Sequence, residues 1–487
     1  MPAKFYDTLL GEYIKNPWMR WISLDKLSGK DFWYRMISYE DITNKSKINF
    51  KDVELKKAAI YSGEDVYITN KLYEKHILEK TNENKVLNEI ELPLIHVLKK
   101  MEIDGVNIDA DRLKWIWILL DSEIKRLEKS IFDEVEMEFN IKSPKQVWEI
   151  LFDKLALPKW KKTKTGYSVW ADVLWELAHD YPIAQKIVDY RHYTKLQSTY
   201  IEWLLNMLDE NWFVHSNYNS AVTTTGRLSS TDPNLQNIPS SDWIAGDIRD
   251  AFVSRFENGK IVALDYSQVE VRILAIMSGD KNLLEAFQNW LDIHHRTAQF
   301  IFPDKTITNS ERKIAKWVNF WVIYWISSFG LSSMLWISMK DAKTYIDKFF
   351  ESYPNVKIFL DNTIKFCEEN NYVETYFGRK RYINWINDLN RIVKSSAERE
   401  AINMPIQWTS ADIIKISMIR TDEFLEKNNL KSKMIMQVHD ELVFDVYPGE
   451  EEIIKKEIKE IMQNVLLDKP ITLKVDFWEW TSWKYAK

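Results

Sequence analysis

The sequence predicts an α+β fold in which a β-sheet platform carries an inserted helical lobe. Residues 260–265 form an apolar, strand-like run that ends on an acid, and residues 434–438 and 441–446 have the pattern of a β-hairpin. Between these parts, residues 276–399 repeat apolar side chains at mostly helical spacing. The chain has 487 residues, 45% of them hydrophobic and 28% charged, and a net charge of −6. This composition is typical of a globular protein of about three domains and excludes disordered and collagen-like classes.

Shifts in periodicity divide the chain into five segments. The first is α-rich, with helical spacing at residues 5–14 and 53–78. Because secondary structure is expected almost from Met1, we expect the chain to be the C-terminal part of a longer product. The segments are expected at residues 1–85, 86–205, 206–275, 276–399 and 400–487.

The second segment is predicted to be helical. Residues 86–101 have helical spacing that stops at the turn before Gly105, and a longer helix is expected at 113–139. Ser143 and Pro144 are typical of an N-cap followed by proline in the first helical turn.

Cysteine content and hydropathy bear on the compartment. Cys367 is the single cysteine, so no intrachain disulfide can form and a reducing, cytoplasmic environment is expected. Residues 317–339 carry no charge and are long enough to cross a bilayer. Asn319 within this stretch and lysines at its ends favour a buried or ligand-lining helix, so we expect no membrane partner.

Three acids follow or begin predicted strands. Asp265 ends one strand, and Asp440 and Glu441 lie at the tip of the hairpin. Such acids can converge on one edge of a sheet, where a divalent cation would offset their repulsion. Two Mg²⁺ ions at such an edge could activate an attacking hydroxyl and stabilise a leaving phosphate. Acids at turns are often merely solvated, so the spacing alone leaves both alternatives open.

Two further sets of side chains recur at four-residue spacing and therefore share a helix face. One set has a cationic end suited to a triphosphate and an aromatic end suited to a base and sugar. The other offers hydrogen-bonding groups suited to a nucleic-acid groove. The first set is Arg312, Lys316, Phe320 and Tyr324, and the second is Arg399, Asn403 and Gln407.

These residues lie in stretches that resemble the motifs of family A DNA polymerases. Residues 265–272 (DYSQVEVR), the Arg312–Tyr324 set and residues 437–441 (QVHDE) resemble motifs A, B and C. Residues 225–239 resemble the palm signature of that family. The resemblance covers essentially the whole chain and implies a right-hand polymerase fold. In it, 86–205 would be the thumb, 206–275 and 400–487 the palm, and 276–399 the fingers.

The resemblance also implies roles for individual residues. Asp265 and Asp440 would hold two Mg²⁺ ions, with Glu441 as a supporting acid. The incoming deoxynucleotide would be bound by Arg312, Lys316, Phe320, Tyr324, His294, Glu270 and Gln268. Primer–template DNA would be contacted by Arg227, Arg399, Asn403, Gln407 and His439, and by Lys162 and Lys164 at the thumb tip.

The implied activity is template-directed DNA synthesis in replication and repair by a monomeric, bacterial, cytoplasmic enzyme. Glu270 would exclude a ribose 2′-hydroxyl, and Phe320 would discriminate against dideoxynucleotides. Two alternatives are a catalytically inactive DNA-binding protein of the same fold and a single-subunit RNA polymerase. The gating role of Glu270 argues against the RNA polymerase.

Residues 1–85 resemble the end of a 3′–5′ exonuclease domain. Tyr61 and Asp65 lie in a stretch similar to its third motif, where they would help to bind metal. The first and second exonuclease motifs have no counterpart here, so we expect this chain alone to lack proofreading.

Tryptophan is abundant where the family uses glycine. The chain has 22 tryptophans and 12 glycines, which together equal the ~7% share usual for glycine alone. Trp321, Trp325 and Trp408 replace motif glycines, and overpacking is expected around the last two. Tryptophan also stands where glycine is usual or common at Trp33, Trp148, Trp212, Trp290, Trp336, Trp478 and Trp480, and some of these sites should need positive φ.

Three explanations of this pattern compete: a UGA codon that the source reads as glycine, a decayed polymerase, and engineering. Decay should not spare every catalytic side chain, and engineering has no evident purpose, so the first is expected. In contrast, Trp483 matches a tryptophan that the family itself uses.

Overall fold

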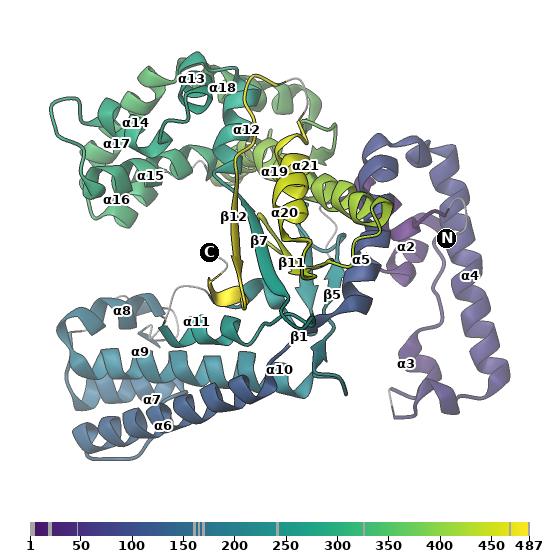
Figure 1. Ribbon diagram of the computed structural model, residues 1–487, viewed down its shortest axis with the longest axis horizontal. Helices are drawn as coiled ribbons and strands as arrows, with labels where there is room; N and C mark the ends of the chain where they lie inside the picture. Colours follow the sequence, from purple (N-terminus) through teal and green to yellow (C-terminus); the bar gives the residue numbers. More distant parts are fainter. Residues whose placement is uncertain are drawn as a thin grey trace.

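The computed structural model describes residues 5–17, 22–45, 47–158, 162–163, 166–167, 171–239, 243–324, 327–466 and 469–485. A central antiparallel sheet lies between three helical lobes in Figure 1. The lobe at the upper left runs from α12 (Val269–Ser278) to α18 (Pro354–Asn370), and the lobe at the lower left runs from α6 (Ala110–Val135) to α10 (Trp203–Asn206). The lobe at the right runs from α2 (Leu24–Phe32) to α4 (Leu55–Leu78). The predicted α+β fold, with a sheet platform and a helical insertion, is confirmed.

The central sheet is built from the predicted strands. Its order is β10 (Lys433–Val438), β11 (Glu441–Val446), β7 (Lys260–Tyr266) and β12 (Val475–Trp480), with every neighbouring pair antiparallel. Alternate residues of β7 enter different cores, Val262 and Leu264 on one face and Ile261 and Ala263 on the other. Because both faces are covered, β7 and β11 are continuous apolar runs rather than alternating ones.

The helical insertion returns to the sheet through one long helix. It begins with α12 (Val269–Ser278), contains α14 (Ile293–Ile301) packed against α15 (Asn309–Tyr324), and is followed by α19 (Arg391–Lys427). Residues 317–339, the stretch with membrane-like hydropathy, fall partly in α15 and partly in α16 (Ser328–Leu335). Among the described residues, no helix is long and apolar enough to cross a membrane.

The helix boundaries of the second segment follow the capping residues. α5 (Leu92–Asp104) ends at the turn expected from the sequence, and the following residue, Gly105, has φ 60°. The helix expected at 113–139 is α6 (Ala110–Val135). It starts earlier because Asp109 caps it, and it ends earlier because Glu136 adopts a left-handed conformation.

The other predicted helices are also present. The spacing at 5–14 corresponds to α1 (Thr8–Lys15), the spacing at 53–78 to α4 (Leu55–Leu78), and Ser143 caps α7 (Pro144–Trp148). The remaining helices are α2 (Leu24–Phe32), α3 (Tyr39–Ile42), α8 (Ala171–Asp180), α9 (Pro182–Lys195), α10 (Trp203–Asn206), α11 (Trp243–Asp250), α13 (Lys281–Gln288), α17 (Met339–Ser352), α18 (Pro354–Asn370), α20 (Glu451–Ile453) and α21 (Lys459–Gln463).

Short strand pairs complete the fold. They are β1 (Val106–Asn107) with β4 (Phe213–Val214), β2 (Lys162–Thr163) with β3 (Gly166–Tyr167), β5 (Asn217–Asn219) with β6 (Ser229–Thr231), and β8 (Tyr372–Glu374) with β9 (Lys380–Tyr382).

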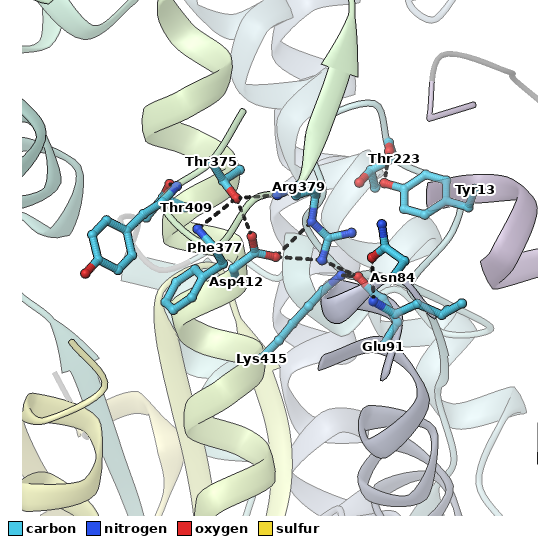
Figure 2. Close-up of polar contacts among 12 residues, drawn as sticks. Tyr13, Asn84, Glu91, Thr223, Thr375, Phe377, Arg379, Thr409, Asp412 and Lys415 are labelled. Carbon is cyan, nitrogen blue, oxygen red and sulfur yellow. Dashed lines mark hydrogen bonds and ion pairs between the residues drawn. The ribbon is translucent and has the colours of Figure 1, made fainter. Parts of the chain in front are cut away.

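A buried network of four charges joins distant segments (Figure 2). Arg379, next to β9, lies 2.5 Å from Glu91 and 2.6 Å from Asp412 of α19. Lys415, one turn further along α19, lies 2.7 Å from the same Glu91 oxygen. All four side chains are at most 1% exposed. Burial alone would raise the pKa of Glu91, but Lys415 and Arg379 outweigh it and hold this pKa below its usual value.

Four tryptophans adopt the left-handed backbone conformation. Their φ values are 54° at Trp33, 69° at Trp212, 54° at Trp290 and 56° at Trp336. At each of these positions glycine is expected from the sequence. The positive φ values agree with the expectation that some of these sites need a left-handed backbone.

The motif tryptophans are placed differently. Trp321 and Trp408 are buried, and Trp408 Nε1 donates to the Thr224 carbonyl at 3.2 Å. A Cβ at Gly226 would lie 3.2 Å from the Trp408 ring, so the indole fills the space against this backbone. Trp325 lies outside the described residues.

We expect Arg379→Met to destabilise the protein strongly, because it leaves two buried carboxylates facing one ammonium group. Breaking a buried ion pair typically costs about 3–5 kcal/mol. The measurement is urea unfolding followed by circular dichroism. As a matched control, Lys394→Met removes the partially exposed pair with Glu368 and should leave the unfolding midpoint nearly unchanged. Equal shifts for the two variants would contradict this role of the network.

Candidate active site

The sheet brings the three predicted acids to one end of the central strands. Asp265 of β7 lies directly opposite Glu441 of β11 on one side and Asp476 of β12 on the other. Directly opposed residues share a face, so the three carboxylates form a row across three strands. Asp440 lies in the adjoining hairpin turn, where its carbonyl accepts from the Tyr266 amide at 3.1 Å.

Glu441 has a buried polar environment. It is 1% exposed and accepts a hydrogen bond from Trp483 Nε1 at 3.0 Å. The Arg249 guanidinium lies 3.9 Å from the centre of the Trp483 ring. Glu441 therefore lies on the largely enclosed side of the acid row.

The hairpin tip is held by the segment that resembles the palm signature. Gln236 Nε2 donates to Gln437 Oε1 at 2.8 Å, and Gln437 Nε2 donates to the His439 carbonyl at 2.5 Å. His439 has φ 56° and is exposed. These bonds fix the turn that carries both His439 and Asp440.

A cavity of about 320 Å³ is lined by Asp440 and by every residue predicted to bind a nucleotide. Its walls come from the turn before α12, from α14 and α15, and from the hairpin tip. The lining residues are Arg227, Gln268, Val269, Glu270, Val271, His294, Arg312, Lys316, Phe320, Tyr324 and Asp440. Residues more than 200 positions apart thus meet in one hollow.

One part of the cavity is cationic and is followed by aromatic side chains. Arg312 Nε lies 2.6 Å from Asp292, whose carboxylate also caps α14. Lys316 Nζ lies 5.9 Å from the centre of the Phe320 ring, and the Phe320 and His294 rings are 6.2 Å apart. The four-residue spacing predicted this order along one face of α15, and the cavity lining matches it.

Glu270 is clamped between two side chains at the other part of the cavity. It is 6% exposed, and its two oxygens accept from Arg227 at 3.0 Å and from Tyr324 at 3.2 Å. Burial raises the pKa of Glu270, Arg227 opposes that effect, and Asp440 adds to it. Tyr324 also has a hydrogen bond with Gln407, and its own pKa is raised by burial and by Glu270.

His294 is enclosed beneath the cationic part. Its ring is 3% exposed, and Nδ1 lies 2.8 Å from Asn319 Nδ2. Burial lowers the pKa of His294 to about 4, and Arg312 and Lys316 act in the same direction against the attraction of Asp292. The ring is therefore neutral at pH 7.

The predicted DNA-binding residues are only partly brought to the cavity. Arg399, Asn403 and Gln407 share one face of α19, with Arg399 exposed and Gln407 touching Tyr324. Asn403 Oδ1 is buried and has no hydrogen-bond partner in the described part of the chain. Lys164 lies outside the described residues, and Lys162 is described only as backbone of β2.

Tyr61 and Asp65 lie elsewhere. They are one turn apart on α4, in the lobe at the right of Figure 1. Burial raises the pKa of Tyr61, with a further contribution from Asp65.

The donor set at the acid row suits a hard divalent cation. Asp265 and Asp440 offer carboxylate oxygens, and Ser410 donates to Asp440 at 3.5 Å. Mg²⁺ is usually held by one or two carboxylates plus substrate phosphates, so two acids beside a cationic cavity fit it. In the described ranges, three potential ligands within 4.8 Å of one another occur only at His96, Asp422 and Glu426. There Lys100 already lies 2.6 Å from Asp422, and a second cation is not required.

Sequence reasoning missed the side chains that support the predicted ones. Ser410 behind Asp440, and Thr297 and Tyr353 behind His294, were not singled out. Asp412 and Lys415 are charges within an otherwise apolar stretch of α19, and that pattern could have indicated a buried ion pair.

Comparisons with known proteins agree with this architecture. The sequence profile of DNA polymerase family A matches residues 110–484. DNA polymerase I of Bacillus subtilis (strain 168) is 42% identical over 492 residues, covering 99% of this chain and 55% of that protein. DNA polymerase I of Caldicellulosiruptor bescii is 45% identical over 402 residues, covering 82% of this chain and 47% of that protein. The chain thus spans about half the length of the curated relatives it matches.

A solved structure is similar over nearly the whole chain. It is the POL domain of Pol1 from M. smegmatis in complex with DNA primer-template and dNTP. The TM-score is 0.87 at 31% identity, with 99% of this chain and 82% of that chain covered.

Proposed function

The chain belongs to DNA polymerase family A, and from that membership we propose that it extends the 3′ end of a DNA primer with deoxynucleoside triphosphates, directed by a template. The observation that carries this proposal is the single cavity that joins a cationic helix face, two aromatic rings and Asp440. The cationic face suits a triphosphate and the aromatic rings suit a base and sugar. Asp440 would hold a metal ion beside the phosphates. The expected partners are primer–template DNA and dNTPs.

The residues divide the reaction between them. Asp265 and Asp440 would hold two Mg²⁺ ions, which when bound activate the primer hydroxyl and stabilise the leaving phosphate. Arg312 and Lys316 bind the triphosphate charge, so that the 3′-oxygen of the primer attacks the α-phosphorus and pyrophosphate leaves. Phe320 and Tyr324 pack on the incoming nucleotide.

Glu270 is proposed to select the sugar. Arg227 and Tyr324 hold both of its oxygens, so the carboxylate cannot swing away from the cavity without losing two hydrogen bonds. A ribose 2′-hydroxyl placed here would meet a side chain that is held in place from two sides, so the proposed gate works by occupying the space that the hydroxyl needs. The same clamp distinguishes this site from that expected of an RNA polymerase.

The lobes are proposed to have the family's roles. Residues 86–205 would act as the thumb, with Lys162 and Lys164 near its tip, 276–399 as the fingers, and 206–275 with 400–487 as the palm. Arg399, Asn403, Gln407 and His439 would contact primer–template DNA, and the orphaned Asn403 oxygen supports this. Residues 1–85, with Tyr61 and Asp65, would be the end of an exonuclease-like domain.

The setting of the enzyme is proposed on narrower grounds. The matched relatives are bacterial, and the single cysteine, Cys367, is buried and free. Both support an enzyme in the cytoplasm of a bacterium. The resemblance to the family is the ground for proposing that it acts as a monomer, with Mg²⁺, in replication and repair.

We expect Asp265→Asn to abolish most primer extension, because it removes a charge from the acid row. Loss of one group that acts on developing charge typically lowers kcat ~10²–10³-fold. Single-turnover extension of a labelled primer with Mg²⁺ measures kcat, and fluorescence anisotropy should show unchanged DNA binding. The control is Glu479→Gln, which removes an acid of β12 that pairs with Lys260 at 3.0 Å. If Asp265→Asn extends the primer at the unaltered rate, the assignment is wrong.

We expect Glu270→Ala to admit ribonucleotides. The ratio of kcat/KM for rNTP to kcat/KM for dNTP should rise ~10–200-fold, the usual range for one pocket contact. Steady-state insertion of single nucleotides measures it. Glu270→Gln keeps the size of the side chain and should retain most of the discrimination. A Glu270→Ala variant that is as selective as the unaltered chain would argue against the gating role.

A further inference from the structure

His294 is held by a chain of hydrogen bonds that involves two helices, α14 and α15, and Tyr353, the residue before α18. Tyr353 and Thr297 share a hydrogen bond of 3.2 Å, and Thr297 Oγ1 donates to Asn319 Oδ1 at 3.0 Å. Asn319 Nδ2 then lies 2.8 Å from His294 Nδ1. All four residues are at most 3% exposed, so water does not compete for these groups.

The direction of these bonds fixes the proton of the imidazole. An amide oxygen only accepts and an amide nitrogen only donates. With Oδ1 of Asn319 occupied by the Thr297 hydroxyl, Nδ2 must donate to His294 Nδ1. A neutral imidazole that accepts at Nδ1 carries its proton on Nε2.

We propose that Asn319 is a positioning residue that locks His294 with its proton on Nε2, so that the ring can only donate to the anionic end of a nucleotide. This inference rests on the proposed function for the identity of the nucleotide. The tautomer itself follows from the contacts and does not depend on it. Asn319 acts through His294, since it does not line the cavity.

Burial is the main reason that the ring stays neutral, since it lowers the pKa of His294, while Arg312 and Lys316 add to this effect and Asp292 opposes it. Asp292 precedes α14, and Arg312 and Lys316 face the ring from α15. Because the pKa of His294 is lowered to about 4, the ring keeps the same protonation between pH 6 and 8. Its contribution to dNTP affinity should be constant over that range.

Nitrogen-15 NMR of the histidine ring tests the tautomer directly. At pH 7, the free protein should show His294 with a protonated Nε2 and an unprotonated Nδ1. Asn319→Leu should give a mixture of the two tautomers. If that variant does not fold, Thr297→Val removes the bond that orients the amide and should give the same mixture. A proton on Nδ1 in the unaltered chain, or a pure Nε2–H form in the variant, overturns the proposal.

Kinetics then separate a positioning effect from a general defect. Asn319→Leu should raise KM for dNTP about tenfold with a smaller change in kcat. Asn319→Asp places a carboxylate at Nδ1 and raises the pKa of His294, so KM should increase as pH rises through that pKa because Nε2 then loses its proton. A flat profile for this variant overturns the proposal. If NMR shows the expected tautomer but neither the unaltered protein nor its variants extend a primer, the proposed function fails and the assignment of the tautomer stands.

The left-handed tryptophans carry a second inference, from backbone geometry. Trp33 and Trp336 end helices α2 and α16, the position at which glycine is preferred because it has no Cβ to clash with the carbonyl. Trp33, Trp212, Trp290 and Trp336 are 94%, 51%, 62% and 83% exposed, so packing offers little compensation. Trp483, in contrast, is 1% exposed and bonds to Glu441.

We infer that the natural protein carries glycine at these four positions, encoded by a codon that its source reads as glycine. Tryptophan supplies as many non-glycine residues of positive φ as asparagine does in the described part of the chain, although asparagine tolerates this conformation and tryptophan does not. The reading of one codon then explains both the low number of glycines and the high number of tryptophans.

The coding DNA and the folding equilibrium both test this inference. UGA codons at the four positions with UGG at Trp483 support it, and UGG at all four overturns it. Independently, Trp336→Gly and Trp33→Gly should each raise the folded-to-unfolded ratio roughly tenfold. Trp115→Gly and Trp175→Gly, at exposed helical positions, should lower it ~5-fold. If Trp336→Gly and Trp33→Gly also lower the folded-to-unfolded ratio, the inferred backbone strain at these two tryptophans is contradicted.

Discussion

The Arg379 guanidinium, buried between Glu91 and Asp412, joins three parts of the chain that lie far apart in the sequence. Unpaired, each of these charges would be costly in a low-dielectric interior, so each segment is stable there only when the others are in place. Tyr13 of α1, which Figure 2 draws beside these residues, connects the N-terminal segment to the same region. Its hydroxyl donates to the Thr223 carbonyl at 2.8 Å. The network thereby fixes α19 along the sheet, and Ser410 of α19 reaches Asp440.

The site combines two kinds of support. The acids stand on the central sheet, where β7 is paired on both edges, whereas most of the side chains that line the cavity project from helices of the insertion. Glu270 connects the two, because it lies in the first turn of α12, shortly after the end of β7, and accepts a hydrogen bond from Tyr324 of α15. A movement of α15 relative to the sheet would therefore stretch or break the hydrogen bond between Tyr324 and Glu270.

The spacing of apolar and polar residues predicted the strands and the helix face that depend on residues close together in the sequence. The apolar run of β7 and the hairpin of β10 and β11 follow from burial on both faces, and the cavity face of α15 follows from four-residue spacing. The network of Glu91, Arg379 and Lys415 joins residues some 300 positions apart, and no periodicity encodes such a pairing. The partners of His294 likewise come from three separate segments. The DNA-contact roles of Arg399 and Lys162 stay predictions.

The row of Glu441, Asp265 and Asp476 has a consequence for folding as well as for chemistry. Three carboxylates abreast on one sheet repel one another, while Lys474, 3.1 Å from Asp476, and Trp483, which donates to Glu441, offset part of this repulsion at the two ends of the row. Any cation that binds there binds the folded chain and not the unfolded one, so its concentration enters the folding equilibrium. For an ion that binds there, the heat resistance of the sheet rises with the ion's concentration, and a chelator that removes the ion lowers it.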